Sequence, residues 1–114
     1  MALNEDNHNE GYVLGRLFAA LEKAQKEAIP GANSTIRDRY IGAASATPAR
    51  VFPQLLKMAQ HHISKADYGW ATERYIQDII AHLDSQAGFP KTLSYDDQGQ
   101  FFIGYYQQIG RAHV

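Results

Sequence analysis

The spacing of apolar residues is the sequence feature that most limits how this chain can fold. It follows the periodicity of helices, and no segment follows the periodicity of strands. The first such series recurs at intervals of three and four residues, and it comprises Leu14, Leu17, Phe18, Leu21, Ala24 and Ala28. Alternating apolar and polar runs are absent, as are the Asn-Gly pairs that close hairpins. The sequence therefore predicts an all-α protein, a small single-domain bundle of about five helices.

Capping residues, prolines and glycines predict where these helices begin and end. The expected helices start at Asn7 or Asn9 and stop before Pro30-Gly31, run from Asn33 or Ser34 to about Ala44, from Thr47-Pro48 to Lys65, from Trp70 to Ser85, and from Ser94 onward. We expect residues 1–8 to be a flexible N-terminus, residues 9–110 the bundle, and residues 111–114 a tail.

The segment from Thr47-Pro48 to Lys65 carries a one-sided row of polar and mostly basic residues. At 100° per residue, the row falls within an arc of about 80° and comprises Arg50, Gln54, Lys57, His61 and Lys65. Pro53 leaves two readings open, because a proline one turn inside a helix removes a hydrogen bond. Either the helix kinks there, or it starts nearer Phe52 and Arg50 leaves the row.

Charge is distributed unevenly over the 114 residues, although the net charge is only −1. Residues 1–33 sum to −2, residues 34–66 to +4 and residues 67–114 to −3. A basic middle segment can bind a polyanion locally, and Arg37 and Arg39 could extend the row. Since acids are missing from the row, we favour a polyanion-binding face over a helix face that is basic by chance.

Three residue pairs could carry chemistry, and each has a simpler interpretation. His61 and His62 are adjacent, so they point about 100° apart on a helix and lack the spacing of zinc ligands. Asp78 and His82 could form an acid–base dyad, but no nucleophile lies nearby in sequence, and Asp96-Asp97 are explained by helix capping. We expect no enzyme activity, no metal and no cofactor.

The composition excludes several other classes of protein. No cysteine is present, so disulfides and thiolate metal sites are ruled out, which fits a reducing compartment such as the cytoplasm. No run of 18 apolar residues predicts a membrane span, and the N-terminal residues lack the pattern of a signal peptide.

The last predicted helix is crowded with aromatic residues. Phe102, Tyr106 and Ile109 share one face, whereas Phe101 and Ile103 lie off it. We therefore expect Phe101, Ile103 and Tyr105 to contact a partner protein.

The segment from Thr35 to Pro48, followed by Val51-Phe-Pro-Gln-Leu-Leu56 and Ala59-Gln-His-His62, resembles the C-terminal region of the large subunit of type I-C CRISPR interference complexes, or Cascade. Further matching motifs are Gly15-Arg16-Leu17-Phe18, Phe89-Pro90, Asp97-Gln-Gly99 and Gly104-Tyr-Tyr106. The resemblance covers residues 10–108 approximately.

The resemblance implies a non-catalytic small subunit, made separately by internal translation initiation and present in more than one copy. Its implied partners are the backbone and large subunits, further copies of itself, and the target DNA with its displaced strand and guide RNA heteroduplex. The role implied is to steady the R-loop.

Combining the resemblance with helical geometry gives the predicted nucleic-acid-binding residues. They are Arg37, Arg39, Arg50, Lys57, His61 and Lys65, with Arg16 and Lys23 as further candidates. The alternative is a structural spacer that contacts its neighbours through the last helix and touches little nucleic acid.

Overall fold

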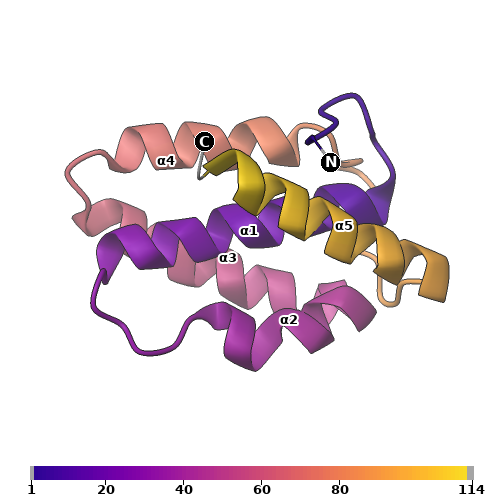
Figure 1. The fold of residues 1–114 in the computed structure, drawn as a ribbon, viewed down its shortest axis with the longest axis horizontal. Coiled ribbons are helices and arrows are strands. Elements are labelled where there is room, and N and C mark those ends of the chain that lie inside the picture. The colour runs from indigo at the N-terminus through magenta and orange to yellow at the C-terminus, as the bar shows by residue number, and fades with distance from the viewer. Residues whose placement is uncertain (1, 113–114) are drawn as a thin grey trace.

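Helix α1 (Glu10–Ala28) is the centre of the fold, because every residue from 11 to 22 is buried. The computed structural model describes residues 2–112. Around α1 pack α2 (Ile36–Ala46), α3 (Pro48–Lys65), α4 (Gly69–Ile80) and α5 (Tyr95–Ala112) (Figure 1). The prediction of an all-α bundle in a single domain is confirmed, and the described residues contain no strand.

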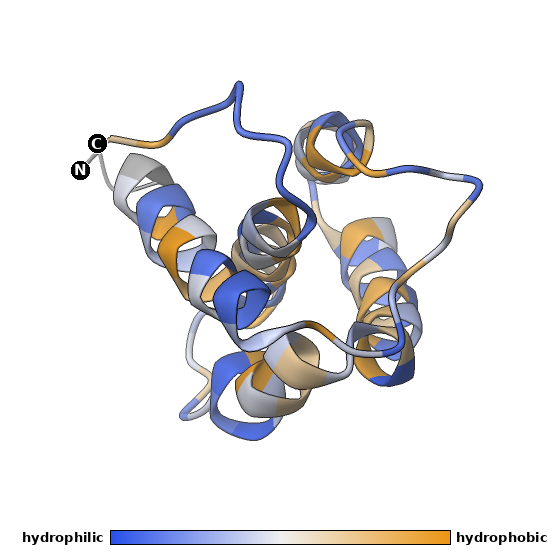
Figure 2. Cartoon of the chain, turned by 90° about the vertical axis from the view of Figure 1, so that its right-hand side faces the viewer, coloured by the Kyte–Doolittle hydropathy of each residue, from blue (hydrophilic) through white to orange (hydrophobic). Residues whose placement is uncertain are grey.

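Helices α1, α3, α4 and α5 are amphipathic, which is why they assemble around a shared core, whereas α2 buries only Ile36, Ala44 and Ser45. Figure 2 shows hydrophobic and hydrophilic residues mixed along the helices. The predicted stripe of α1 meets the side chains of α3 and α5 in a cluster of aromatic rings. The ring centroid of Phe18 lies 6.4 Å from that of Phe52, 6.0 Å from that of Phe101 and 5.6 Å from that of Tyr105. Such edge-on and tilted pairs add to the stability gained from burial.

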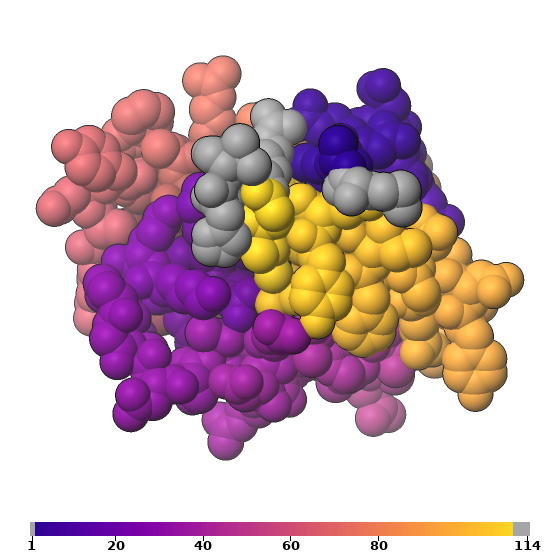
Figure 3. Space-filling view, in the orientation of Figure 1, coloured from indigo at the N-terminus to yellow at the C-terminus, as the bar shows by residue number. Residues whose placement is uncertain are grey.

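Helices α1 and α5 approach each other at glycines. A Cβ atom at Gly15 would collide with the carbonyl oxygen of Phe101, and one at Gly104 would collide with that of Tyr12. Gly11 is in the same position against Asp97. Only residues without a side chain allow backbones this close, so these glycines fix which face of α5 meets α1. In the space-filling view α5 lies across the front of the molecule, with α2 below it (Figure 3).

This contact corrects the predicted interface on the last helix. Phe101 and Tyr105 are buried inside the chain and are not available to a partner. The sequence reading failed because apolar residues surround α5, so the periodicity did not identify the inward face. Ile103 remains exposed, as do Tyr95 and Tyr106.

The predicted helix boundaries hold in part. Asn9 caps α1 by accepting a hydrogen bond from the backbone N–H of Tyr12, as one of the two predicted caps. Helix α2 starts later than predicted, because Thr35 and Asp38 form a capping box. Helix α4 is shorter than predicted and ends at Ile80. Helix α5 includes residues 111 and 112 of the predicted tail, while residues 113 and 114 lie outside the described residues.

Pro53 lies inside α3, so the predicted alternative in which the helix starts nearer Phe52 is wrong. The helix begins at Pro48 and continues through Pro53, whose ring is exposed. The hydroxyl of Thr47 does not cap α3 and instead donates to the carbonyl oxygen of Ala43 at the end of α2. Since α3 starts at Pro48, Arg50 stays within the helix and within the row.

A buried carboxylate ties three helices together. Glu22 of α1 accepts hydrogen bonds of 2.6 Å from the hydroxyl of Tyr105 in α5 and from the hydroxyl of Thr35 at the start of α2. Burial, with the hydrogen bond and charge of Glu22, raises the pKa of Tyr105 far above its usual value. The phenol therefore stays protonated and remains a donor to the carboxylate.

Candidate nucleic-acid interface

The basic row of α3 lies on the surface of the protein. Arg50, Gln54, Lys57, His61 and Lys65 are all exposed, whereas Val51, Phe52, Leu55 and Ala59 on the other side of the helix are buried. Burial of that side fixes the rotation of the helix, so the row must face outward. From Arg50 to Lys65 the row is about 22 Å long, at 1.5 Å per residue.

The cations of the row are not neutralised by carboxylates. Within the described part of the chain, none of the four basic side chains of the row forms an ion pair, and the pair present there is between Lys23 and Glu27. Gln54 lies beside α2, where its side-chain amide donates to the hydroxyl of Tyr40 at 3.4 Å. An exposed and unpaired row of cations is an electrostatic surface that can take a polyanion.

Arg37 and Arg39, which were predicted to extend the row, belong to α2 and not to α3. Arg37 is exposed but held at the junction of α2 and α5, where it donates to the hydroxyl of Tyr106 at 2.7 Å. Its guanidinium carbon also lies 5.7 Å and 5.5 Å from the ring centroids of Tyr105 and Tyr106. Arg39 is exposed, but two residues along a helix turn it about 200° from Arg37. The two arginines therefore do not extend the row together.

Arg16 is inside the protein, which corrects its assignment as a nucleic-acid contact. Only 4% of its surface is exposed, and its Nε donates to the side-chain oxygen of Gln108 at 2.7 Å. Lys23 is half-buried, with its Nζ 3.8 Å from Glu27 and 4.7 Å above the ring of Tyr75. Both side chains contact neighbouring residues of the folded protein, and sequence spacing alone did not reveal these contacts.

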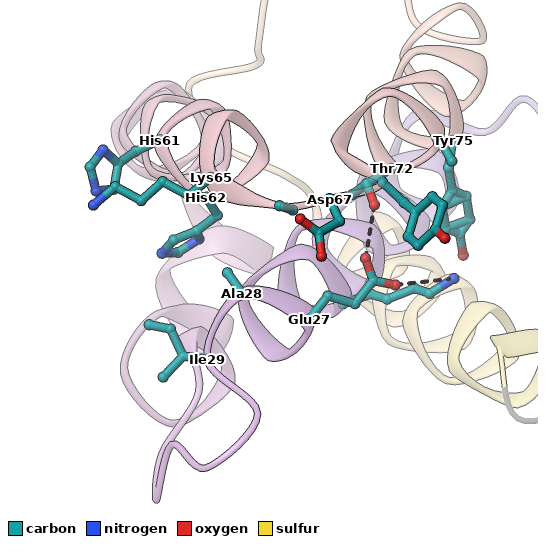
Figure 4. Close-up of a pocket in the computed structure, with 13 residues that line it drawn as sticks. Glu27, Ala28, Ile29, His61, His62, Lys65, Asp67, Thr72 and Tyr75 are labelled. Carbon is teal, nitrogen blue, oxygen red and sulfur yellow. Dashed lines mark hydrogen bonds and ion pairs between the residues drawn. The ribbon is translucent and has the colours of Figure 1, made fainter.

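A groove of about 790 Å³ opens at the C-terminal end of the row, between α1, α3 and α4. Figure 4 shows His61, His62 and Lys65 on one side of this groove, with Glu27, Thr72 and Tyr75 on the other. We call it the α3–α4 groove. Burial, with the charges of His61 and Lys65, lowers the pKa of His62 below its ordinary value. His62 is therefore neutral at pH 7 and adds no positive charge to the row there.

Two aromatic residues at the edge of this region are exposed. Tyr68 follows α3 and lines the groove, and Trp70 stands in the first turn of α4. Neither is among the nucleic-acid-binding residues predicted from the sequence. Helical periodicity contained the signal, since Trp70 lies about 120° or more from Ile76 and Ile79 around α4.

His82, the candidate for an acid–base dyad with Asp78, contacts a different residue. The Nδ1 of His82 lies 2.8 Å from the Nε2 of His8, so the ring of His82 is hydrogen-bonded to a distant histidine. Among residues 2–112 there is no group of three side chains able to hold a metal ion. No helix in the same range is long and apolar enough to cross a membrane.

The sequence was also compared with known protein families. A family model described as CRISPR-associated protein (Cas_Csd1) matches residues 1–112. No curated protein matches the chain.

Proposed function

The chain belongs to the CRISPR-associated Cas_Csd1 family, and from this premise we propose that it is a non-catalytic small subunit of a type I-C surveillance complex. In this proposal it binds nucleic-acid backbone without sequence preference and steadies the R-loop during target recognition. It acts in the cytoplasm, beside the backbone and large subunits and further copies of itself. It corresponds to the separately translated C-terminal region of the large subunit.

The observation that carries the proposal is the exposed row of α3. Arg50, Lys57, His61 and Lys65 present donors along about 22 Å without an ion-paired carboxylate among the described residues. Phosphates along one strand of a duplex repeat at about 3.4 Å, so the row spans roughly six nucleotides.

Modest backbone contacts are sufficient for this role. In R-loop formation the heteroduplex gained is about as stable as the DNA duplex lost, so the exchange is nearly balanced. A few phosphate contacts on the opened strands can therefore shift the equilibrium. Because several copies act in one complex, weak contacts by each copy add through effective concentration.

The test is the salt dependence of single-stranded DNA binding by the purified chain. Three phosphate contacts by Arg50, Lys57 and Lys65 predict a log–log slope of about −2, at about 0.7 per contact for single strands. Lys57→Glu should weaken binding and reduce the slope by at least about 0.7. The matched control is Lys26→Glu, which changes the same charge in a different groove, between α1, α4 and α5.

Binding that does not respond to salt, or that Lys57→Glu and Lys26→Glu weaken equally, would contradict the proposal. Because avidity in the assembly supplies part of the affinity, a negative result with the free chain is repeated in the assembled complex.

The alternative function is a structural spacer, and the outer side of α5 favours it. Tyr95 and Ile103 are exposed there, and apolar side chains of this size on one helix face are typical of protein contacts. Under this alternative, Ile103→Glu removes the chain from the complex while DNA binding by the free chain is weak and insensitive to salt.

A further inference from the structure

The turn between α3 and α4 presents two large aromatic side chains to solvent. Tyr68 is 74% exposed and Trp70 is 69% exposed, whereas the phenylalanines of the core are fully buried or half-buried. Aromatic side chains of this size contribute large buried areas when they are packed. Two of them left uncovered within three residues indicate a surface that something else covers.

Backbone contacts fix the path of this turn. The backbone N–H of Ala66 donates to the carbonyl oxygen of Ile63 at 3.2 Å, and that of Gly69 donates to Ala66 at 3.3 Å. A Cβ atom at Gly69 would collide with the carbonyl oxygen of Ile63, so the chain passes too close for any other residue. Tyr68 and Trp70 flank this glycine and are therefore positioned by backbone packing.

The aromatic pair lies where the basic row ends. Lys65 is the last residue of α3 and His61 is one turn earlier, and both line the α3–α4 groove together with Tyr68. Grooves that bind single-stranded nucleic acid combine cations that follow the backbone with aromatic side chains on which bases stack. Here the groove supplies the cations and Tyr68, and Trp70 stands just beyond it in the first turn of α4, outside the residues that line the groove.

We propose that Tyr68 and Trp70 are a stacking platform for unpaired bases of the strand whose phosphates follow α3. This inference rests on the proposed function and adds to it the form of nucleic acid that is bound, namely single strands with accessible bases. The displaced strand of an R-loop has such bases, whereas a paired heteroduplex does not.

The charges inside the groove fit a base better than a phosphate. Glu27 is occupied, since its Oε1 lies 3.8 Å from the Nζ of Lys23 and its Oε2 accepts from the hydroxyl of Thr72 at 2.8 Å. Asp67 adds a second carboxylate beside Tyr68. Carboxylates repel phosphate and accept hydrogen bonds from the N–H groups of bases, which include the ring N–H of thymine. The phosphates therefore stay over α3, and the bases lie toward Tyr68.

The chain carries its own reporter for this contact, because Trp70 is its single tryptophan. We would titrate the protein with a deoxythymidine oligomer of about 12 nucleotides and with an abasic oligomer of equal length, which keeps the phosphates and removes the bases. The proposal predicts that the deoxythymidine oligomer quenches Trp70 fluorescence and that the abasic oligomer, although bound, does not.

Affinities of variants give the second readout, from the anisotropy of labelled oligomers. Trp70→Ala should weaken binding of the deoxythymidine oligomer by about 5- to 150-fold, the range for one stacked base, and change binding of the abasic oligomer little. Trp70→Phe, which keeps a ring, should restore most of the loss. The control is Tyr95→Ala, which removes an aromatic residue that is even more exposed from the first turn of α5.

Each contrary outcome identifies what fails. Equal, salt-sensitive affinity for both oligomers without quenching overturns the stacking platform and leaves the proposed function standing. Absence of salt-sensitive binding to either oligomer, in the free chain and in the complex, overturns both. If Trp70→Ala binds both oligomers normally but no longer enters the complex, the two aromatics contact a protein and the proposal is wrong.

Discussion

Glu22 shows how a single buried residue organises this bundle. The residue is 3% exposed, and its carboxylate accepts hydrogen bonds from Tyr105 and Thr35, which belong to different parts of the chain. A buried carboxylate is costly unless its oxygens are hydrogen-bonded, and here both oxygens are. No spacing rule identifies this node, because the three residues are separated by 13 and 83 positions.

We predict that Tyr105→Phe destabilises the protein by about 1–3 kcal/mol, since it leaves one buried oxygen of Glu22 without its donor. Chemical denaturation followed by circular dichroism measures the change. Tyr95→Phe, the same substitution at a fully solvated ring, should change the free energy of unfolding by less than about 0.5 kcal/mol. Equal effects at the two positions would show that the Glu22 contact does not stabilise the fold.

The sequence predicted the location of some site side chains but not of others. The exposure of Lys57 and Lys65 follows from helical periodicity, because a strongly apolar opposite face fixes the rotation of α3. Arg16 and Arg37 could not be placed that way, since Gln108 and Tyr106 reach them from α5. The positions of these two arginines depend on contacts with α5, a helix that is distant from them in sequence.

At the scale of the helix, the contact between α1 and α5 depends on glycines. Gly11 and Gly15 are one turn apart on α1, and Gly104 is their counterpart on α5. The sequence predicted α1 and its buried stripe correctly but chose the wrong face of α5. The glycines could have identified the inward face of α5, because two helix backbones can approach this closely only at glycines.

We predict that Gly104→Ala is strongly destabilising, by more than about 2 kcal/mol, because its methyl group would collide with the backbone of Tyr12 and force α1 and α5 apart. The midpoint of thermal or urea unfolding measures this. Gly99→Ala on the same helix has open space around the new methyl group, so it should be neutral or stabilise the protein by up to about 1 kcal/mol. Similar effects of the two substitutions would contradict the close contact.

Over the whole molecule, the distribution of charge matters more than its sum. The net charge is −1, yet the cations of α3 form a row of about 22 Å on a protein whose longest dimension is 37 Å. A surface of this length can bind a strand even though the pI of about 6.5 suggests no affinity for nucleic acid. The proposed small-subunit function requires this surface to face the opened DNA in the assembled complex.

The most direct measurement of that claim is the lifetime of R-loops formed by the assembled complex, at several salt concentrations. We predict that a chain carrying Arg50→Glu, Lys57→Glu and Lys65→Glu enters the complex normally, shortens the R-loop lifetime, and lowers the salt slope by about 2, at about 0.7 for each lost contact. A complex with this variant whose R-loop lifetime and salt dependence equal those of the wild type would contradict a role for the α3 row in holding nucleic acid.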